Sequence, residues 1–233
     1  MIRGLVRGVG WVLTAAGLVV VLYLVYSLLF TNLETGRAQQ RLLDDFTAAV
    51  DTAAAPGPSP TPTPTAAGPE PTAVPGAQAG GDPRLGGGAD GDGDAVALIW
   101  FSRPGGDPPV TDERYVVVDG VALPDLEAGP GHYPQTAEPG GEGNFAVAGH
   151  RTTHGAPFFR LDDLREGDRV HVLATDGREH TYEVRRQQVV APTALWVLGD
   201  DPIATGGPTI TLTTCHPRFS NRQRLVAFGE LVT

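Results

Sequence analysis

Residues 209–215 read Thr-Ile-Thr-Leu-Thr-Thr-Cys, an alternation of apolar and hydroxyl side chains that is typical of a half-buried β-strand. Asp176-Gly177, between two similar runs, predicts a two-residue hairpin. The C-terminal part of the chain holds further short runs rich in Val, Ile, Thr, Tyr and Phe, at 96–100, 114–121, 144–149, 169–175, 180–190 and 224–232. Helical candidates there are short, at 156–164 and 193–198. Seven or eight strands predict an all-β fold, either a barrel or a sandwich.

The 233 residues contain one region that can form a globular core and two that cannot. Residues 8–30 carry no charge, and residues 52–94 hold 19 Pro or Gly among 43 residues and no aromatic side chain. The remaining 139 residues, 95–233, are near the commonest domain size. The sequence therefore predicts a cytoplasmic tip and membrane anchor over 1–33, a juxtamembrane helix over 34–51, a linker over 52–94 and a β domain over 95–233.

The uncharged segment has the length of a transmembrane helix. Its 23 residues would rise about 34 Å as a helix, enough to cross a bilayer. Arg3 and Arg7 precede it and Glu34 follows it, so the charge bias predicts a single-pass anchor with a cytoplasmic N-terminus and the rest of the chain outside. A cleaved signal peptide is the alternative, but its apolar region is normally only about 7–15 residues long.

The segment after the anchor predicts a helix and then an extended stalk. Leu42, Leu43, Phe46 and Val50 recur at helical spacing, which predicts a short juxtamembrane helix, with a fraying turn or two as the alternative. The Pro-rich and Gly-rich linker predicts a disordered stalk that reaches at most ~130 Å. That length suggests a domain working at a distance from the bilayer, in cell-wall material.

Charge and motif spacing exclude several functions. The β domain carries 18 acidic residues and 12 Arg, so it lacks the basic excess that binding to a phosphate backbone requires, and nucleic acid is not an expected partner. The acidic pairs suggest calcium, but none has the spacing of a dedicated calcium loop: Asp162-Asp163, Glu166 with Asp168, and Asp200-Asp201. No zinc pattern or phosphate-binding glycine motif is present. We therefore expect no cofactor and no metal site.

The single cysteine, Cys215, ends the 209–215 strand. It cannot form an internal disulfide, so it is either buried and inert, or bonded to another molecule, or reactive. A thiol becomes a nucleophile only as a thiolate, which needs a nearby cation or proton acceptor. His150 follows an apolar strand in the same strand-to-loop setting, which favours it among the six histidines. His216 adjoins Cys215, but neighbours on a strand point to opposite faces.

Three stretches together resemble the sortases, which are cell-wall cysteine transpeptidases: Thr211-Leu-Thr-Thr-Cys215, Gly149-His-Arg151 and Arg224-Leu-Val226. Four more are most similar to class E sortases of high-GC Gram-positive bacteria: Gly-Pro-Gly-His-Tyr-Pro at 129–134, Ala-Gly-His-Arg-Thr-Thr at 148–153, Gly-Ala-Pro-Phe at 155–158 and Cys-His-Pro at 215–217. The resemblance covers essentially residues 95–233. It implies a sortase-like closed β-barrel of seven or eight strands with short helices.

The resemblance also implies roles for three residues. Cys215 would attack the carbonyl of a Thr-Gly bond in the C-terminal sorting signal of a secreted protein, LAxTG-like or LPxTG. The acyl group would then pass to an amine of a peptidoglycan precursor or another cell-wall acceptor. His150 would act as acid and base, and Arg224 would donate hydrogen bonds to the oxyanion or to the substrate backbone.

Other residues near these motifs are assigned by weaker arguments. Arg222 rivals Arg224 because residues two apart on a strand share a face, but the family pattern selects Arg224 and leaves Arg222 facing solvent. Tyr133 and Thr214 are expected to contact the substrate. Arg151 is expected to be an ordinary surface residue.

Two other functions remain open from the sequence. A cysteine hydrolase of wall peptides would let water resolve the thioester, although the order His before Cys differs from the common wall-hydrolase and papain-like layouts. A non-catalytic stalked domain would bind wall polymer or a partner, with Cys215 merely packed. The sequence predicts localisation to the cell membrane, with the β domain outside and facing the wall.

Overall fold

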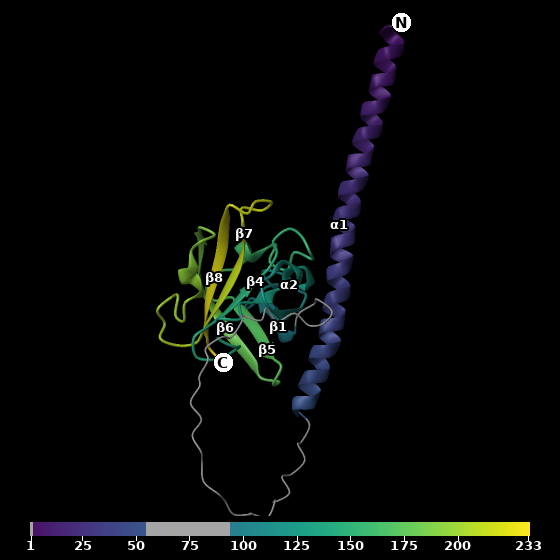
Figure 1. Cartoon of the computed structure of the whole chain (residues 1–233). Coiled ribbons are helices and arrows are strands. Elements are labelled where there is room, and N and C mark those ends of the chain that lie inside the picture. Colours follow the sequence, from purple (N-terminus) through teal and green to yellow (C-terminus); the bar gives the residue numbers. More distant parts are fainter. Residues whose placement is uncertain (1, 55–93) are drawn as a thin grey trace, which may run out of the picture.

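The structure, a computed structural model, describes residues 2–54 and 94–233 (Figure 1). One long helix, α1 (Ile2–Ala54), lies beside a closed barrel whose strands follow the order β1-β2-β3-β4-β7-β8-β6-β5. The strands are β1 (Ala95–Ser102), β2 (Tyr115–Asp119), β3 (Gly131–His132), β4 (Asn144–Ala148), β5 (Arg169–Ala174), β6 (Glu179–Val190), β7 (Thr209–His216) and β8 (Gln223–Leu231). Three short helices accompany them: α2 (Leu123–Ala128) and the 3-10 helices η1 (Leu161–Asp163) and η2 (Leu195–Leu198).

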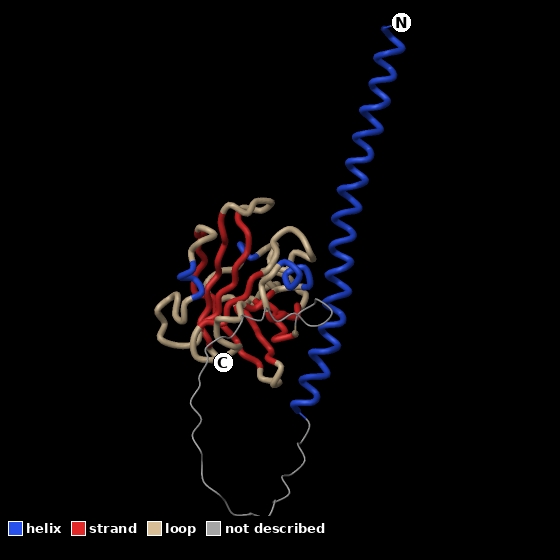
Figure 2. The backbone as a smooth tube through the Cα atoms, viewed as in Figure 1, coloured by secondary structure: helices blue, strands red, loops and turns tan. Residues whose placement is uncertain are grey.

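The closed barrel confirms the predicted all-β domain and selects the barrel over the sandwich. All seven predicted strands are present, and Figure 2 shows them curved around one core. The sequence missed β3 because two residues carry no periodicity, and it missed α2. The β5–β6 hairpin has a four-residue loop instead of the predicted two, in which Gly177 has φ +82° and the Asp176 carboxylate accepts from the Arg178 backbone N–H.

Alternation along the strands divides the barrel into an interior and an outer face. Phe145 and Val147 of β4 point into the core cluster, as do Ile210 and Leu212 of β7. Their neighbours in sequence therefore point outward. The outer face of β7 and β8 carries Thr213, Cys215 and Arg224, and also Val226 and Phe228, which pack in a separate apolar cluster.

The second half of α1 packs on the outer face of β1 and β2. Ala38, Leu42 and Phe46 are buried there, in a cluster completed by Leu98, Val116, Val118 and Ala128. The sequence grouped Leu43 with these residues, but Leu43 is 43% exposed because it lies about 100° around the helix from Leu42, at the edge of the buried face. Residues 34–51 are thus helical as part of a much longer helix that docks on the domain.

A glutamine side chain joins α1 to the backbone of β2. Gln39 Nε2 donates to the carbonyl oxygens of Val116 (3.1 Å) and Ala128 (2.9 Å), and Gln39 Oε1 accepts from the Val116 N–H (2.8 Å). These contacts matter because buried backbone groups need partners. The side-chain amide of Gln39 therefore bonds to the backbone of β2 in the way that the backbone of a neighbouring strand would.

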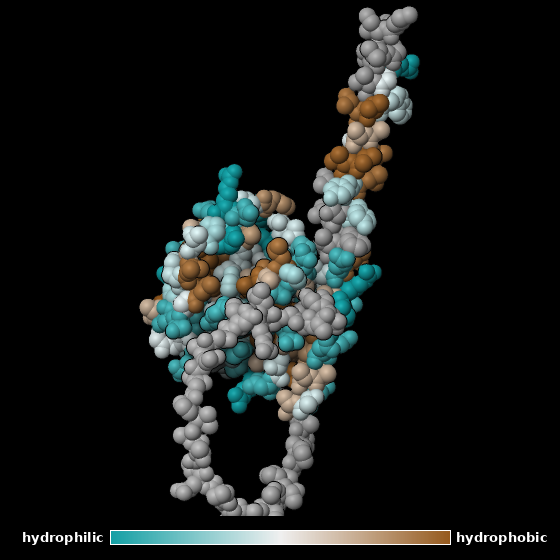
Figure 3. All heavy atoms as spheres, in the orientation of Figure 1, coloured by the Kyte–Doolittle hydropathy of each residue, from teal (hydrophilic) through white to brown (hydrophobic). Residues whose placement is uncertain are grey.

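No helix within 2–54 or 94–233 combines the length and hydropathy that crossing a membrane requires. The anchor predicted at 8–30 therefore stays a prediction. The part of α1 that projects beyond the barrel does carry exposed hydrophobic side chains, Leu13 and Leu18 among them (Figure 3). The stalk predicted over 52–94 lies outside the described residues, apart from the end of α1 and Asp94.

Replacing Phe46 by Ala should undock α1. Phe46 is 2% exposed, so its truncation should cost about 3 kcal/mol and raise hydrogen exchange in residues 34–50 and at the Val116 amide about 100-fold. Leu43→Ala, one turn away on the exposed side, is the matched control and should change exchange little. Equal exchange in the two variants, measured by mass spectrometry, would contradict the docking.

Candidate active site

The strand register brings Cys215, His150 and Arg224 to one level of the barrel. Cys215 of β7 pairs directly with Arg224 of β8. On the other side of β7, Ala148 of the parallel strand β4 pairs with Thr213, and the Gly149 N–H donates to the Thr213 carbonyl (3.0 Å). Two residues after Ala148 lies His150, just beyond the end of β4, and two residues after Thr213 lies Cys215. All three therefore end on the same outward face, because side chains two apart share a face.

An open cavity of about 560 Å³ lies beside this row. Cys215 is a free cysteine and is only partly buried, as is His150. The cavity is lined by the His150 loop and the β7–β8 loop: His150, Arg151, Thr152, Thr153, Cys215, Phe219, Ser220, Asn221 and Arg222. A peptide can therefore approach the thiol and the imidazole from one side.

The structure places Arg224 and Arg222 in different surroundings. Arg224 Nη1 donates to the backbone carbonyls of Asn221 and Gln223, at 3.0 Å each. These bonds hold its guanidinium at the β7–β8 turn, next to the strand pair that carries Cys215. Arg222 is exposed, as expected, but it also lines the cavity, which the expectation of a residue facing only solvent did not include.

The environment of His150 favours its neutral form. Burial lowers the pKa of His150 below the ordinary 6.5, the neighbouring His154 lowers it further, and Glu127 opposes both effects. The buried Nε2 of His150 has no hydrogen-bond partner in the described part of the chain. A neutral imidazole near pH 7 can accept a proton from a thiol or an amine.

Gly149 sets the backbone path into His150. A Cβ at this position would lie 2.6 Å from the ring of Phe158, so only glycine fits. Thr214 is buried, and its hydroxyl donates to the Gly149 carbonyl at 2.7 Å. The alternation of β7 turns the Thr214 side chain away from the face of Cys215, and its expected contact with the substrate stays a prediction.

Tyr133 lies on the face that carries Cys215. Its hydroxyl is 3.3 Å from Oγ1 of Thr213, two residues before Cys215 on β7. Tyr133 is half-buried, and its backbone N–H donates to the Ala146 carbonyl of β4 (3.0 Å). This places the ring over β4 and β7, where a contact with bound peptide remains a prediction.

Arg151 is a buried residue of the site, so its expected surface role is wrong. It is 2% exposed, and Nη1 donates to the Cys215 carbonyl (3.3 Å) and lies 3.0 Å from Nδ1 of His216. Nη2 forms an ion pair with Asp162 at 2.8 Å, and Arg218 pairs with the other oxygen of the same carboxylate at 2.8 Å. No sequence signal marked this network, because Asp162 is 53 residues from Cys215 along the chain.

The Asp162 carboxylate stays ionised within this network. Its partial burial alone would raise its pKa, but Arg218 and Arg151 outweigh that effect and hold the pKa of Asp162 below its ordinary value. The charge of Asp162 therefore offsets that of buried Arg151. The network ties the His150 loop, η1 and the end of β7 together.

One further residue of each acidic pair is engaged in contacts within the protein. Asp163 pairs with Arg160, Asp168 pairs with Arg103, and Asp201 accepts the backbone N–H groups of its own turn. No group of three or more His, Cys, Asp or Glu side chains that could hold a metal ion occurs within residues 2–54 and 94–233.

Residues 108–232 match the family model of the Sortase domain, over the part of the chain that holds the cavity and the row of Cys215, His150 and Arg224. The chain belongs to the sortase family. This sortase is 30% identical to Sortase SrtE2 of Streptomyces coelicolor, over 96% of this chain and 80% of that protein. It is 38% identical to Sortase SrtE1 of the same organism over 44% of this chain, which covers only 32% of that relative.

A solved structure supports the same relationship. Sortase E1 from Streptomyces coelicolor, determined with a tripeptide in its active site, superposes with a TM-score of 0.53 and 32% identity over 62% of this chain and 91% of that chain. These relatives identify a sortase of the class E type. Sortases are cysteine transpeptidases, so this class of enzyme follows for the chain.

Replacing Arg151 by Met should destabilise the sortase by about 1–3 kcal/mol, because the Cys215 carbonyl and His216 lose a buried donor. Urea unfolding measures the difference. Arg160→Met is the control: Arg160 is 53% exposed and pairs with Asp163, and its loss should cost less than about 0.5 kcal/mol. Similar losses in both variants would contradict the structural role of Arg151.

Proposed function

We propose that this sortase cleaves a Thr-Gly bond in a C-terminal sorting signal and transfers the acyl group to a cell-wall amine. The observation that supports the proposal is the row of Cys215, His150 and Arg224 on one face, next to an open cavity. Membership of the sortase family supports the class of reaction. The acceptor is the amine of a peptidoglycan precursor or of another wall component.

The proposed reaction has two acyl transfers. The Cys215 thiol gives its proton to neutral His150 as the sulfur attacks the threonine carbonyl. The tetrahedral intermediate collapses to a thioester, and the glycine amine leaves with the proton from His150. The acceptor amine then gives a proton to His150 as it attacks the thioester. An amide forms, and the Cys215 thiolate leaves and takes the proton back.

Arg224 is proposed as the donor to the developing oxyanion. Its Nη1 is used by the Asn221 and Gln223 carbonyls, so the Nε and Nη2 groups are the donors that would face the substrate. Guanidinium stays charged at all relevant pH values, and fixed donors need no reorganisation when the oxyanion forms. The cross-strand pairing with Cys215 supports this position.

The proposed signal is LAxTG-like, with LPxTG as the alternative. Similarity to class E sortases supports the first signal, and the tripeptide in the solved relative supports peptide binding at this kind of site. Tyr133, above Thr213 on the same face as Cys215, is the proposed contact to the signal. The clients would be secreted proteins that carry such a signal.

Incubation with an LAxTG or LPxTG peptide and an amine should give a ligated peptide, detected by mass spectrometry. Cys215→Ala should abolish ligation and the thioester intermediate. Peptide cleavage without ligation would instead identify a hydrolase. If neither product nor thioester forms and alkylation of Cys215 has no effect, the transpeptidase proposal fails.

The two arginines provide a matched pair for the same assay. Arg224→Met should lower kcat/KM roughly 100-fold to 1,000-fold, as the loss of one oxyanion donor does. Arg222→Met removes the same charge from the cavity lining and should cost less than about 10-fold. The reverse order would assign the oxyanion role to Arg222.

We also propose that residues 8–30 anchor the sortase in the cell membrane, with the barrel outside and facing the wall. The 23 uncharged residues and the preceding Arg3 and Arg7 support this arrangement. Because residues 34–50 dock on β1 and β2, the barrel would then lie beside the helix that leaves the bilayer. Carbonate extraction of cells should leave the full chain in the membrane fraction and release a chain without residues 1–33; release of both would contradict the anchor.

A further inference from the structure

A second histidine lies against His150 on its own loop. The rings of His150 and His154 are 4.7 Å apart between centroids and tilted by 31°. His154 has φ +51°, so the loop makes a left-handed turn that folds this ring back onto His150. The proposed transpeptidation assigns no role to His154.

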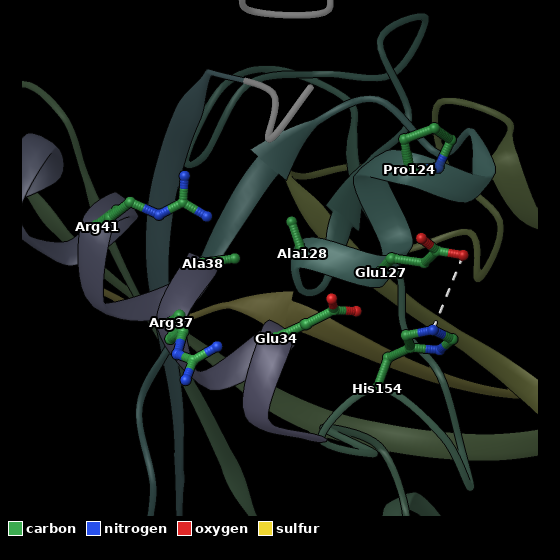
Figure 4. Close-up of a pocket in the computed structure, with 8 residues that line it drawn as sticks. All are labelled: Glu34, Arg37, Ala38, Arg41, Pro124, Glu127, Ala128 and His154. Atoms are coloured by element: carbon green, nitrogen blue, oxygen red, sulfur yellow. Dashed lines mark ion pairs between the residues drawn. The ribbon is translucent and has the colours of Figure 1, made fainter. Parts of the chain in front are cut away.

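His154 also faces an acid from another element. Its Nε2 lies 3.8 Å from Oε1 of Glu127 in α2, the contact drawn as a dashed line in Figure 4. Glu127, His154 and His150 therefore follow one another from α2 to the active site, and we call them the Glu127–His154–His150 group. The buried Nδ1 of His154 has no hydrogen-bond partner in the described ranges.

Helix α1 completes the surroundings of this group. Thr35 of α1 is buried, and its hydroxyl donates to the Glu127 carbonyl at 2.8 Å. Glu34, Arg37 and Arg41 of α1 line a cavity of about 370 Å³ together with His154, and of the three Glu34 extends toward the side of His154 (Figure 4). Docking of α1 thus fixes the backbone carbonyl of Glu127 and brings charged side chains of α1 to the cavity that His154 lines.

We propose that His154 is a positioning residue for His150: its ring packs against the imidazole, and its charge, balanced by Glu127, sets the proton affinity of His150. The inference rests on the proposed function, in which His150 moves the protons. A protonated His154 repels a second proton on His150, whereas Glu127 attracts one. Glu127 and His154, which lie outside the row of Cys215, His150 and Arg224, thereby control the proton affinity of His150.

The opposite signs of these effects allow a sharp test. His154→Phe keeps an aromatic ring but removes the charge, so the pKa of His150 should rise. Glu127→Gln removes the attraction, so the pKa of His150 should fall. The shift in His154→Phe should be at least about half a pH unit, the value for unit charges about 5 Å apart at the dielectric constant of water. The shift in Glu127→Gln should be smaller because Glu127 contacts His154 and not His150. His154→Lys, which restores a cation, should return the pKa toward that of the unaltered chain.

Histidine NMR titration of the full-length protein measures the pKa of His150 directly, with the His150→Asn spectrum as the assignment. Glu142 is an exposed acid outside the Glu127–His154–His150 group, so Glu142→Gln is the matched control and should leave the pKa of His150 unchanged. Thermal unfolding of each variant separates the effect from misfolding, and Glu127→Gln tests the inference even if His154→Phe does not fold. Because the titration needs no turnover, its result is independent of the ligation assay.

The pH profile of kcat/KM supplies the second readout. The limb assigned to His150 should move up in His154→Phe and down in Glu127→Gln, a pattern that a merely structural role would not produce. Equal pKa values in all folded variants, or shifts of the same sign, would overturn the inference.

Discussion

The site depends on the backbone pairing of β7 with its two neighbours. β4 runs parallel to β7 and β8 runs antiparallel to it, and their registers bring three residues from distant parts of the chain to one level of the barrel. A slip of one residue in either pairing would turn a functional side chain to the opposite face. The placement of these three side chains is therefore a property of the sheet, and the interior side chains Phe145, Val147, Ile210 and Leu212 maintain it by filling the core.

Support around this row comes from polar groups that the sequence does not mark as functional. Arg151 reaches from the His150 loop to the carbonyl of Cys215, and Asp162 offsets its charge. Thr214 fixes the carbonyl of Gly149 from the buried side of β7. Each contact restrains the backbone next to Cys215 or His150, and a catalytic site requires placement of that kind.

The N-terminal helix is a structural part of the domain as well as its proposed connection to the membrane. Gln39 completes the hydrogen bonds of β2, and Phe46 and Leu42 bury the apolar outer face of β1 and β2. The helical spacing of Leu42 and Phe46 was visible in the sequence, but the surface that covers them was not.

Local patterns were enough to predict the strands and the all-β class and to select Cys215 and His150 as the proposed reactive pair, because alternation, strand ends and a single cysteine are properties of neighbouring residues. The resemblance to sortases implied the closed barrel, but the burial of Arg151 and Thr214, the place of Arg222 in the cavity lining and the contact between His154 and Glu127 depend on segments that are distant in the chain. Side-chain burial and charge pairing arise only when such segments pack together, so no local pattern could reveal them.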